Sequence, residues 1–192
     1  GFANADSATL YGAEVEAQAF FPLDWIGGGF FATRRLLLVG NYTYTQSEIA
    51  ASNRVIVGPD LQRVASNLLF RDGAPMTGQS DHLVNLQIGI EDTDRLSQAT
   101  VLLNYASDRV TNRGPVQGLL RQPDIVERPG LRVDFVAREG FEVWNREIEL
   151  KLEIRNIFRQ GYREFQQAGA NRLFTNAYDV GTSFSLGASV RF

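Results

Sequence analysis

Cysteine is absent from the 192 residues, so the chain forms no disulfide and offers no thiolate ligand to a metal. Basic residues are not in excess, because 19 Lys and Arg stand against 22 Asp and Glu, a formal net charge of -3. Proteins that bind nucleic acid need a clustered basic surface, and the sequence has no such cluster. We therefore expect no nucleic-acid partner.

Long apolar runs are also missing. A membrane helix needs roughly 18 to 20 consecutive apolar residues, whereas the longest candidate is the short stretch 36–39. This excludes a helical membrane protein and leaves a soluble globule or a membrane β-barrel, because barrel strands hide their apolar residues in alternation. Residues 1–4 carry no signal peptide, so we expect any export signal to lie upstream of Gly1.

Alternation of apolar and polar residues is the dominant pattern, and it persists over segments longer than the usual five or six residues of soluble strands. It predicts strands at about 9–21, 35–47, 82–91, 98–110, 131–138, 144–158 and 178–192. The clearest segment is 144–158. Its two sides are Ile148, Leu150, Leu152 and Ile154 against Glu147, Glu149, Lys151, Glu153 and Arg155. So many charges on one side cannot face a dry core.

The predicted connections differ in length in a regular way. They are long (48–81), short (92–97), long (111–130), intermediate (139–145) and long (159–177). Long loops outside and short turns inside are typical of outer-membrane barrels. The link 22–34 before the second strand is longer than a tight turn and fits this arrangement less well. It carries Gly27, Gly28 and Gly29, which we interpret as a flexible turn.

One loop contains a pattern of a different period. Within 54–71, the apolar residues Leu61, Val64, Ala65 and Leu68 fall at helical spacing. They predict a short helix that packs against the barrel mouth, with contact to a ligand as the sharper alternative.

Aromatic residues separate the membrane reading from a soluble β-sandwich, which would show the same alternation. If the last strand ends on the periplasmic side, the aromatics of the apolar sides fall mostly at the strand ends. They are Tyr11, Tyr42, Tyr44, Tyr105, Phe158 and Tyr178 at the outer rim, and Phe21, Trp144 and Phe192 at the inner rim. Positions between the rims are mostly aliphatic, with Phe135 and Phe184 deeper. This distribution predicts the two aromatic girdles of a membrane barrel.

Catalytic and metal chemistry find little support. His82 is the only histidine, and its neighbours Ser80 and Asp81 would have to complete a catalytic site. Adjacent residues on an extended chain point apart, so we interpret His82 as a polar residue where a loop meets a strand. A hydrolase stays as an alternative. We expect no metal and no cofactor, because the acidic side of segment 144–158 alternates with cations and forms a charge ladder.

Arginines in the predicted loops are the candidate ligand contacts. Arg71, Arg113 and Arg121 would meet an anionic ligand or lipid phosphates through charge-assisted hydrogen bonds. The alternative is ordinary solvated charge on exposed loops.

Several motifs resemble known outer-membrane proteins. The final Phe192, with apolar Val190, Ala188, Leu186 and Phe184 at every second position before it, resembles the C-terminal signature that the barrel-assembly machinery recognises. Four stretches resemble the C-terminal barrel of TonB-dependent receptors. They are YGAEVEAQ (11–18), NYTYTQSE (41–48), PMTGQSDHLVNLQIGIED (75–92) and LKLEIRNIF (150–158), the last ending in the NIF that closes the family's penultimate strand.

The resemblance implies an all-β fold, an antiparallel transmembrane β-barrel segment of about seven long meandering strands, the last part of a barrel of about 22 strands. Residues 1–192 would be a single C-terminal barrel portion, and the odd strand count itself indicates a fragment. The plug domain and the TonB box, through which the receptor meets TonB, are absent from these residues.

The function that the resemblance implies is active transport, not catalysis. A scarce nutrient, such as an iron chelate, a vitamin or a glycan, would cross the outer membrane of a Gram-negative bacterium. The expected partners are that substrate, outer-membrane lipid, TonB through the missing plug, and the assembly machinery. A passive porin or adhesin-type barrel and a soluble β-sandwich binding module are the alternatives.

Overall fold

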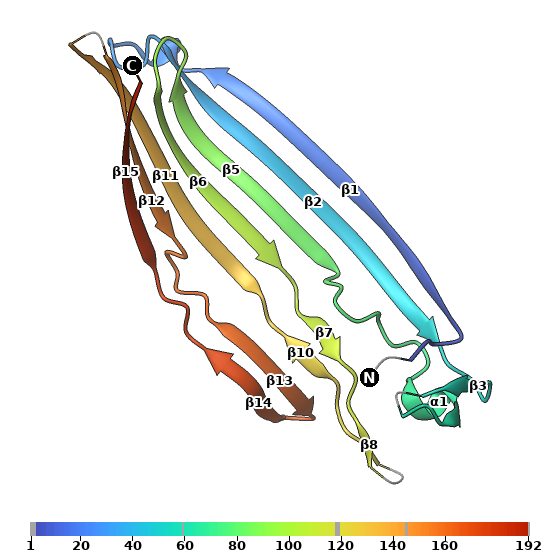
Figure 1. The fold of residues 1–192 in the computed structure, drawn as a ribbon. Coiled ribbons are helices and arrows are strands. Elements are labelled where there is room, and N and C mark those ends of the chain that lie inside the picture. The colour runs from blue at the N-terminus through green and yellow to red at the C-terminus, as the bar shows by residue number, and fades with distance from the viewer. Residues whose placement is uncertain (1–2, 59, 118–119, 145, 192) are drawn as a thin grey trace.

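An antiparallel sheet of seven strands dominates the structure, a computed structural model that describes residues 3–58, 60–117, 120–144 and 146–191 (Figure 1). In spatial order the strands are β1 (Ser7–Pro22), β2 (Arg34–Ala50), β5 (His82–Asp92), β6 (Ser97–Ala106), β11 (Gly130–Val143), β12 (Arg146–Arg155) and β15 (Ser183–Arg191). This order follows the sequence, so the sheet is an up-and-down meander. The all-β antiparallel fold predicted from alternation is confirmed.

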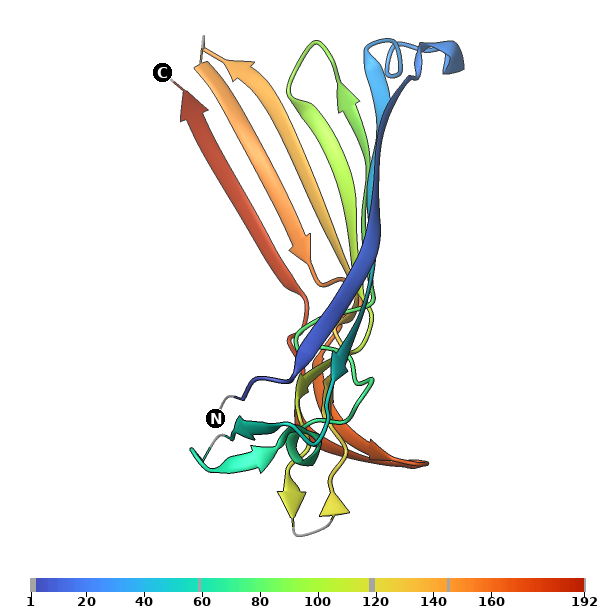
Figure 2. The same ribbon diagram turned by 90° about the vertical axis from the view of Figure 1, so that its right-hand side faces the viewer.

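Shorter elements gather mainly at one end of this sheet (Figures 1 and 2). A four-stranded sheet has the order β14 (Asn171–Tyr178), β13 (Tyr162–Ala168), β10 (Ile125–Glu127) and β7 (Arg109–Asn112). Two small hairpins join β3 (Val55–Val57) to β4 (Arg63–Ala65) and β8 (Val116–Gln117) to β9 (Leu120–Arg121). The helical elements are α1 (Ser66–Leu69) and, at the opposite end of the sheet, the 3-10 turn η1 (Asp24–Ile26). Among the described residues, no helix is long and apolar enough to cross a membrane.

Register between the seven strands produces two faces of opposite character. Residues directly opposite each other on paired strands share a face. One such row crosses the whole sheet and consists of Ala19, Leu38, Ile88, Val101, Phe135, Ile154 and Phe184. We call this side the apolar face and the other side, which carries the charges of β12, the polar face.

The apolar face has no second layer over it in the part of the chain that is described (Figure 2). Phe184, Leu186 and Val15 on this face are 72%, 77% and 65% exposed. Within the same residues, only five hydrophobic side chains are buried: Leu37, Ile49, Ala74, Val133 and Phe165. A β-sandwich would bury such a face against a second sheet, whereas the four-stranded sheet lies beyond the end of the seven-stranded one.

The seven-stranded sheet does not close on itself. β1 pairs only with β2 and β15 only with β12, so each of these strands has one unpaired edge among the described residues. Two connections at the end of the sheet that carries η1 are short. β5 ends at Asp92 and β6 begins at Ser97, and β11 ends at Val143 and β12 begins at Arg146. The connections that carry the small hairpins and the four-stranded sheet lie at the other end, so the link 23–33 with η1 is the long exception at the end of the short turns.

Several predicted boundaries are wrong. The connection predicted at 139–145 does not exist as such, because β11 continues to Val143 and only a tight turn remains, with Trp144 at φ 50°. Glu139 interrupts the apolar alternation, yet its backbone still pairs with β12, as do those of Gly140 and Glu142 after it. The strand predicted at 98–110 is divided into β6 and β7 at residues 107–108.

The last predicted strand is also two strands. Tyr178 ends β14 and pairs with Tyr162, while β15 begins at Ser183. Between them the chain turns at Gly181, whose φ of 73° suits glycine. The connections predicted at 111–130 and 159–177 as loops instead supply most of the four-stranded sheet.

The predicted loop helix is largely wrong. Leu61 has a φ of 64° and is exposed, and Val64 lies in β4, which pairs with β3. Only α1, a single turn that includes Leu68, is helical. The turn predicted around Gly27 and Gly28 is confirmed, since both have positive φ.

Asn156, in the NIF motif, fixes the junction between the two sheets. Its side chain donates to the carbonyls of Gln160 (3.0 Å) and Gly181 (2.8 Å), and its Oδ1 accepts from the backbone N–H of Gln160 (2.8 Å). Its own N–H donates to the Asp134 carboxylate at 2.7 Å. The residue is buried with φ 56°, a conformation that Asn tolerates better than most residues.

We expect Asn156→Ala to lower the free energy of unfolding by about 2–4 kcal/mol, because buried backbone groups lose their partners. Urea unfolding of the full-length protein measures this loss. Asn176→Ala, on the exposed strand β14, is the matched control and should change the value by less than about 0.5 kcal/mol. Equal effects of the two variants would contradict the junction role of Asn156.

Candidate functional site

The polar face carries a ladder of ion pairs along β11 and β12. Arg138 binds Glu149 at 2.7 Å, and Glu153 accepts from both Lys151 (2.6 Å) and Arg155 (3.0 Å). The pairs lie on one side because these residues alternate with Leu150, Leu152 and Ile154. The predicted charge ladder is therefore present.

A second polar feature crosses the same face at right angles to the strands. Asn41, Asn85 and Asn104 lie opposite one another on β2, β5 and β6, and we call them the asparagine row. Asn85 Nδ2 donates to Asn41 Oδ1 (2.8 Å), and Asn41 Nδ2 donates to Glu14 Oε1 (2.6 Å). Arg132 on β11 continues the row opposite Asn104. The row presents amide donors and acceptors beside a cation.

The asparagine row leads into a cleft of about 520 Å³, where the polar face meets the four-stranded sheet. We call it the outer cleft. Its side chains are mainly amide, guanidinium and phenol groups: Asn85, Asn104, Arg128, Arg132, Gln160, Tyr162 and Tyr178, with Glu127 and Leu83. The volume is in the range of small-molecule sites.

Two interactions set the geometry and charge of the outer cleft. Arg128 forms a bidentate pair with Asp108, at 3.0 Å from Nε to Oδ1 and 2.7 Å from Nη2 to Oδ2, and so clasps the break between the two sheets. The rings of Tyr162 and Tyr178 stack at 4.9 Å. Burial and, after it, the hydrogen bond to Glu164 raise the pKa of Tyr162 to about 12. The phenol is protonated at neutral pH, and its hydrogen bond is directed at the Glu164 carboxylate.

This arrangement suits binding more than covalent chemistry. Amides and phenols hydrogen-bond hydroxyls and carbonyls, while the arginines match carboxylates or phosphates. Within the described residues, no group of three or more His, Asp or Glu side chains could hold a metal ion.

The candidate hydrolase residues have other partners. Ser80 Oγ donates to the carbonyl of Ser107 at 2.8 Å, and His82 Nδ1 lies 2.8 Å from the Tyr42 hydroxyl. The His82 ring also packs against Tyr44, with centroids 5.3 Å apart. These contacts place His82 in a rim of tyrosines.

Two of the three predicted loop arginines hold the connections together. Arg113 binds Asp124 (2.8 Å) and the carbonyl of Pro75. Arg121 donates to the carbonyls at the end of α1, which are those of Asn67 (3.1 Å), Leu68 (2.8 Å) and Leu69 (2.9 Å). Arg71 is exposed just after this helix. Their contact with a ligand stays a prediction.

Four predicted girdle residues lie on the apolar face near the long connections: Tyr11, Tyr42, Tyr44 and Tyr105. Two of their hydroxyls share one polar partner: Tyr44 donates to Gln46 Oε1 at 2.9 Å, and Tyr11 donates to the same atom. An apolar ring with a hydrogen-bonded tip suits an interface between water and lipid. The girdle itself stays a prediction.

The other predicted rim residues lie elsewhere than expected. Tyr178 is the last residue of β14 in the four-stranded sheet and is not part of β15. Its ring stacks on Tyr162. Trp144 is exposed in the turn between β11 and β12 instead of starting a strand, and Phe158 is exposed in the turn after β12. Phe192, the predicted assembly signal, lies outside the described residues.

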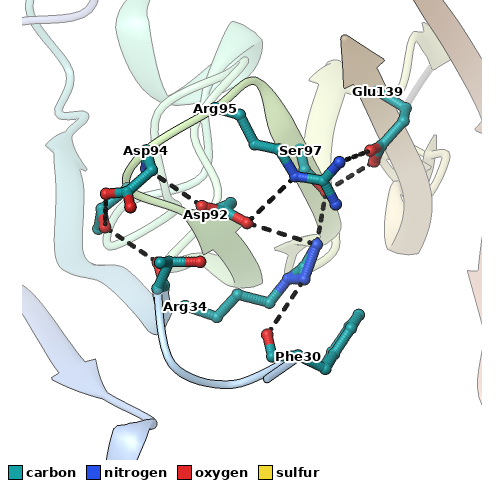
Figure 3. A network of polar contacts seen from close by, with 9 residues as sticks. Phe30, Arg34, Asp92, Asp94, Arg95, Ser97 and Glu139 are labelled. Carbon is teal, nitrogen blue, oxygen red and sulfur yellow. Dashed lines mark hydrogen bonds and ion pairs between the residues drawn. The ribbon is translucent and has the colours of Figure 1, made fainter. Parts of the chain in front are cut away.

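The structure contains a cluster of charged residues that the sequence did not predict. It lies on the apolar face, at the end of the sheet with the short turns. Arg34, Asp92, Arg95, Ser97 and Glu139 form a connected network, which we call the rim cluster (Figure 3). The Arg34 guanidinium lies 3.0 Å from Ser97 Oγ and 3.6 Å from the Asp92 carboxylate. The Phe30 ring covers it at 3.8 Å. Alternation could have located Arg34 and Glu139, which continue the apolar sides of Leu36 and Ala137, had the strands been extended far enough.

Comparison with known proteins found no matching family model, no similar curated protein and no similar solved structure. A function for this chain must therefore be inferred from its own faces, rims and connections.

The contacts of Arg121 indicate a structural role, which is to hold the carbonyls of α1, and this role can be tested apart from ligand contact. We expect Arg121→Gln to increase tryptic cleavage after Arg71 severalfold without any ligand present, because α1 loses the group that holds its carbonyls. Timed proteolysis followed by mass spectrometry measures this rate, with Arg172→Gln in the β13–β14 hairpin as control. An unchanged rate would reject the structural role of Arg121.

Proposed function

We propose that this chain is the C-terminal barrel part of a TonB-dependent receptor, which imports a scarce nutrient across the outer membrane of a Gram-negative bacterium. The main support is one observation: a seven-stranded meander carries a continuous apolar face with no cover and a polar face behind it. In water such a face would be a severe aggregation hazard, whereas in a bilayer it meets acyl chains.

Strand length and connection length support the membrane part of the proposal. The strands have between 9 and 17 residues, and a tilted membrane-crossing strand needs about 9–11. Short connections at one end and long, folded connections at the other match the periplasmic and outer sides of such barrels. Under this proposal, the polar face lines the lumen and the four-stranded sheet stands outside the cell.

The unpaired edges of β1 and β15 support a larger barrel. Open strand edges are not tolerated in lipid, since their backbone groups would have no partners. Further strands of the same protein would pair with both edges. The receptor assignment within barrels comes from the resemblance of the four sequence stretches. Among them, the NIF motif of residues 156–158 follows directly after β12, and in the family this motif closes the penultimate strand.

The outer cleft and the asparagine row support import of a polar ligand. The cleft opens at the outer end of the polar face, and the row continues from it across β6, β5 and β2. A ligand held first by Arg132, Tyr162 and the amides would meet similar groups along the lumen wall. An iron chelate, a vitamin and a glycan all offer suitable hydroxyls or carboxylates.

Substitution by arginine on the two faces tests the membrane. Ile88 and Gln87 are neighbours near the middle of β5, both exposed, on the apolar and the polar face. We expect Ile88→Arg to cost about 2–4 kcal/mol of assembly and Gln87→Arg to cost about 0–1, because only the first places a cation in lipid. The amount of folded, heat-modifiable protein in outer-membrane fractions measures this. Equal tolerance of both variants, or recovery of the parent protein in soluble fractions, would overturn the membrane proposal.

Energy dependence tests the receptor against a passive porin. Cells that express the full-length protein would be given ferric chelates, cobalamin and oligosaccharides, with and without TonB. We expect uptake of one class to saturate and to be lost in the strain that lacks TonB. Uptake that persists at the same rate without TonB would identify a passive pore.

A further inference from the structure

The rim cluster has a closed half and an open half. Arg34 and Asp92 have side chains only 6% and 5% exposed, so solvent and ligands have little access to this pair. Arg95 and Glu139 are 58% and 46% exposed, and their guanidinium and carboxylate are 3.4 Å apart. Ser97 joins the halves, since it accepts from Arg34 and donates to Glu139 at 2.6 Å. Arg95 Nε also lies 3.4 Å from the Asp92 carboxylate, which is a second link between the halves, while the Arg95–Glu139 side stays open to a ligand (Figure 3).

An apolar groove of about 410 Å³ begins directly beside the open half. Its floor is the pair Ala99 and Ala137, which lie opposite each other on β6 and β11. Ile90 borders one side and Leu152 the other, because both occupy the same cross-strand row. The two alanines make the row hollow where its neighbours are large.

The groove and the open half are two parts of one surface. The row of Ser97 and Glu139 is two residues further along the strands than the row of Ala99 and Ala137, which is about 7 Å. An amphipathic molecule whose polar end touches Glu139 and Arg95 would therefore place its first methylene groups over the alanines. Phe30 closes the far side of the polar end.

We propose that this surface binds one phospholipid with a zwitterionic amine headgroup, whose phosphate meets Arg95 and whose ammonium meets Glu139. This inference rests on the proposed membrane location, which puts the short connections at the headgroup level of the periplasmic leaflet. The acyl chain lies in the alanine groove. The cation of the exposed Arg95–Glu139 pair matches the phosphate of the lipid, and its carboxylate matches the ammonium. Both protein charges therefore keep an opposite charge beside them when the lipid headgroup enters between them.

Charge selects among headgroups. A phosphatidylglycerol has no cation for Glu139, and its phosphate would be repelled by the neighbouring carboxylates of Asp92 and Glu139. A phosphatidylcholine has a cation but no N–H to donate, so it loses the hydrogen bond that an ethanolamine ammonium makes. The order of affinity is therefore ethanolamine, then choline, then glycerol.

Native mass spectrometry of the full-length protein in nonionic detergent tests the proposal, with dioleoyl phosphatidylethanolamine, phosphatidylcholine and phosphatidylglycerol as probes. We expect one ethanolamine lipid to be retained with about tenfold preference over the glycerol lipid, the value of one charge-assisted hydrogen bond. Glu139→Gln should abolish the preference, because the amide can still accept from Ser97 but has no charge. Glu142→Gln, on the polar face of the same strand, is the matched control and should keep it.

Filling the groove tests the acyl part separately. Ala137→Leu should lower retention of all three lipids, whereas Ala17→Leu, on the apolar face of β1, should change none. Equal retention of the three headgroups, or identical behaviour of Glu139→Gln and Glu142→Gln, would overturn the lipid site. Such a result in a protein that still fractionates with the outer membrane would leave the proposed function intact, and a soluble protein would remove both.

Discussion

Hydrogen-bond register between neighbouring strands decides which side chains share a face of a sheet. From β1 to β15 the six ladders keep a constant register, whereas the four-stranded sheet has irregularities near Val126 and Phe165. A slip of one residue at β12 would bring its charged side chains onto the apolar face beside Phe135 and Ala137. The continuity of both faces, and with it the outer cleft, the asparagine row and the groove over Ala99 and Ala137, depends on this pairing.

The balance of charge on the apolar face follows from the same constraint. Its middle rows contain aliphatic and aromatic residues, while charged residues lie towards the ends of the strands, as in the row of Arg34, Asp92 and Glu139. A single buried cation there would be costly. Pairing with Asp92, the hydrogen bond to Ser97 and the Phe30 ring together compensate Arg34, so the row marks a border between apolar and polar surroundings.

Alternation is a local property, so the sequence alone could locate most of the long strands. It predicted β1, β2 and β5 to within a few residues and placed Asn41, Asn85 and Asn104 on polar sides. It failed at the end of β11, where Glu139 pairs through its backbone although it breaks the pattern. Tyr178 continues the alternation of β15, but the turn at Gly181 separates them.

Register joins strands that are distant in sequence, and no local pattern encodes it. The asparagine row, the rim cluster and the alanine floor were therefore beyond sequence reasoning, although each of their residues could be assigned to a side. The loop arginines were found by their chemistry, but Arg121 and Arg113 have carbonyl and carboxylate partners that only the folded connections bring near. The four-stranded sheet was missed because its strands are short and its segments were taken as loops.

The junction between the two sheets has a consequence for protein engineering. Four chain segments change sheets at about the same level, at residues 107–108, 128–129, 156–161 and 179–182. The side chains of Asn156, Arg128 and Asp108 hold the junction together. The hydrogen-bond ladders of the seven-stranded sheet do not include residues of the four-stranded sheet. The four-stranded sheet can therefore be exchanged as a unit: a hairpin of another length or sequence, grafted at these four points, would leave the seven-stranded sheet and its register in place.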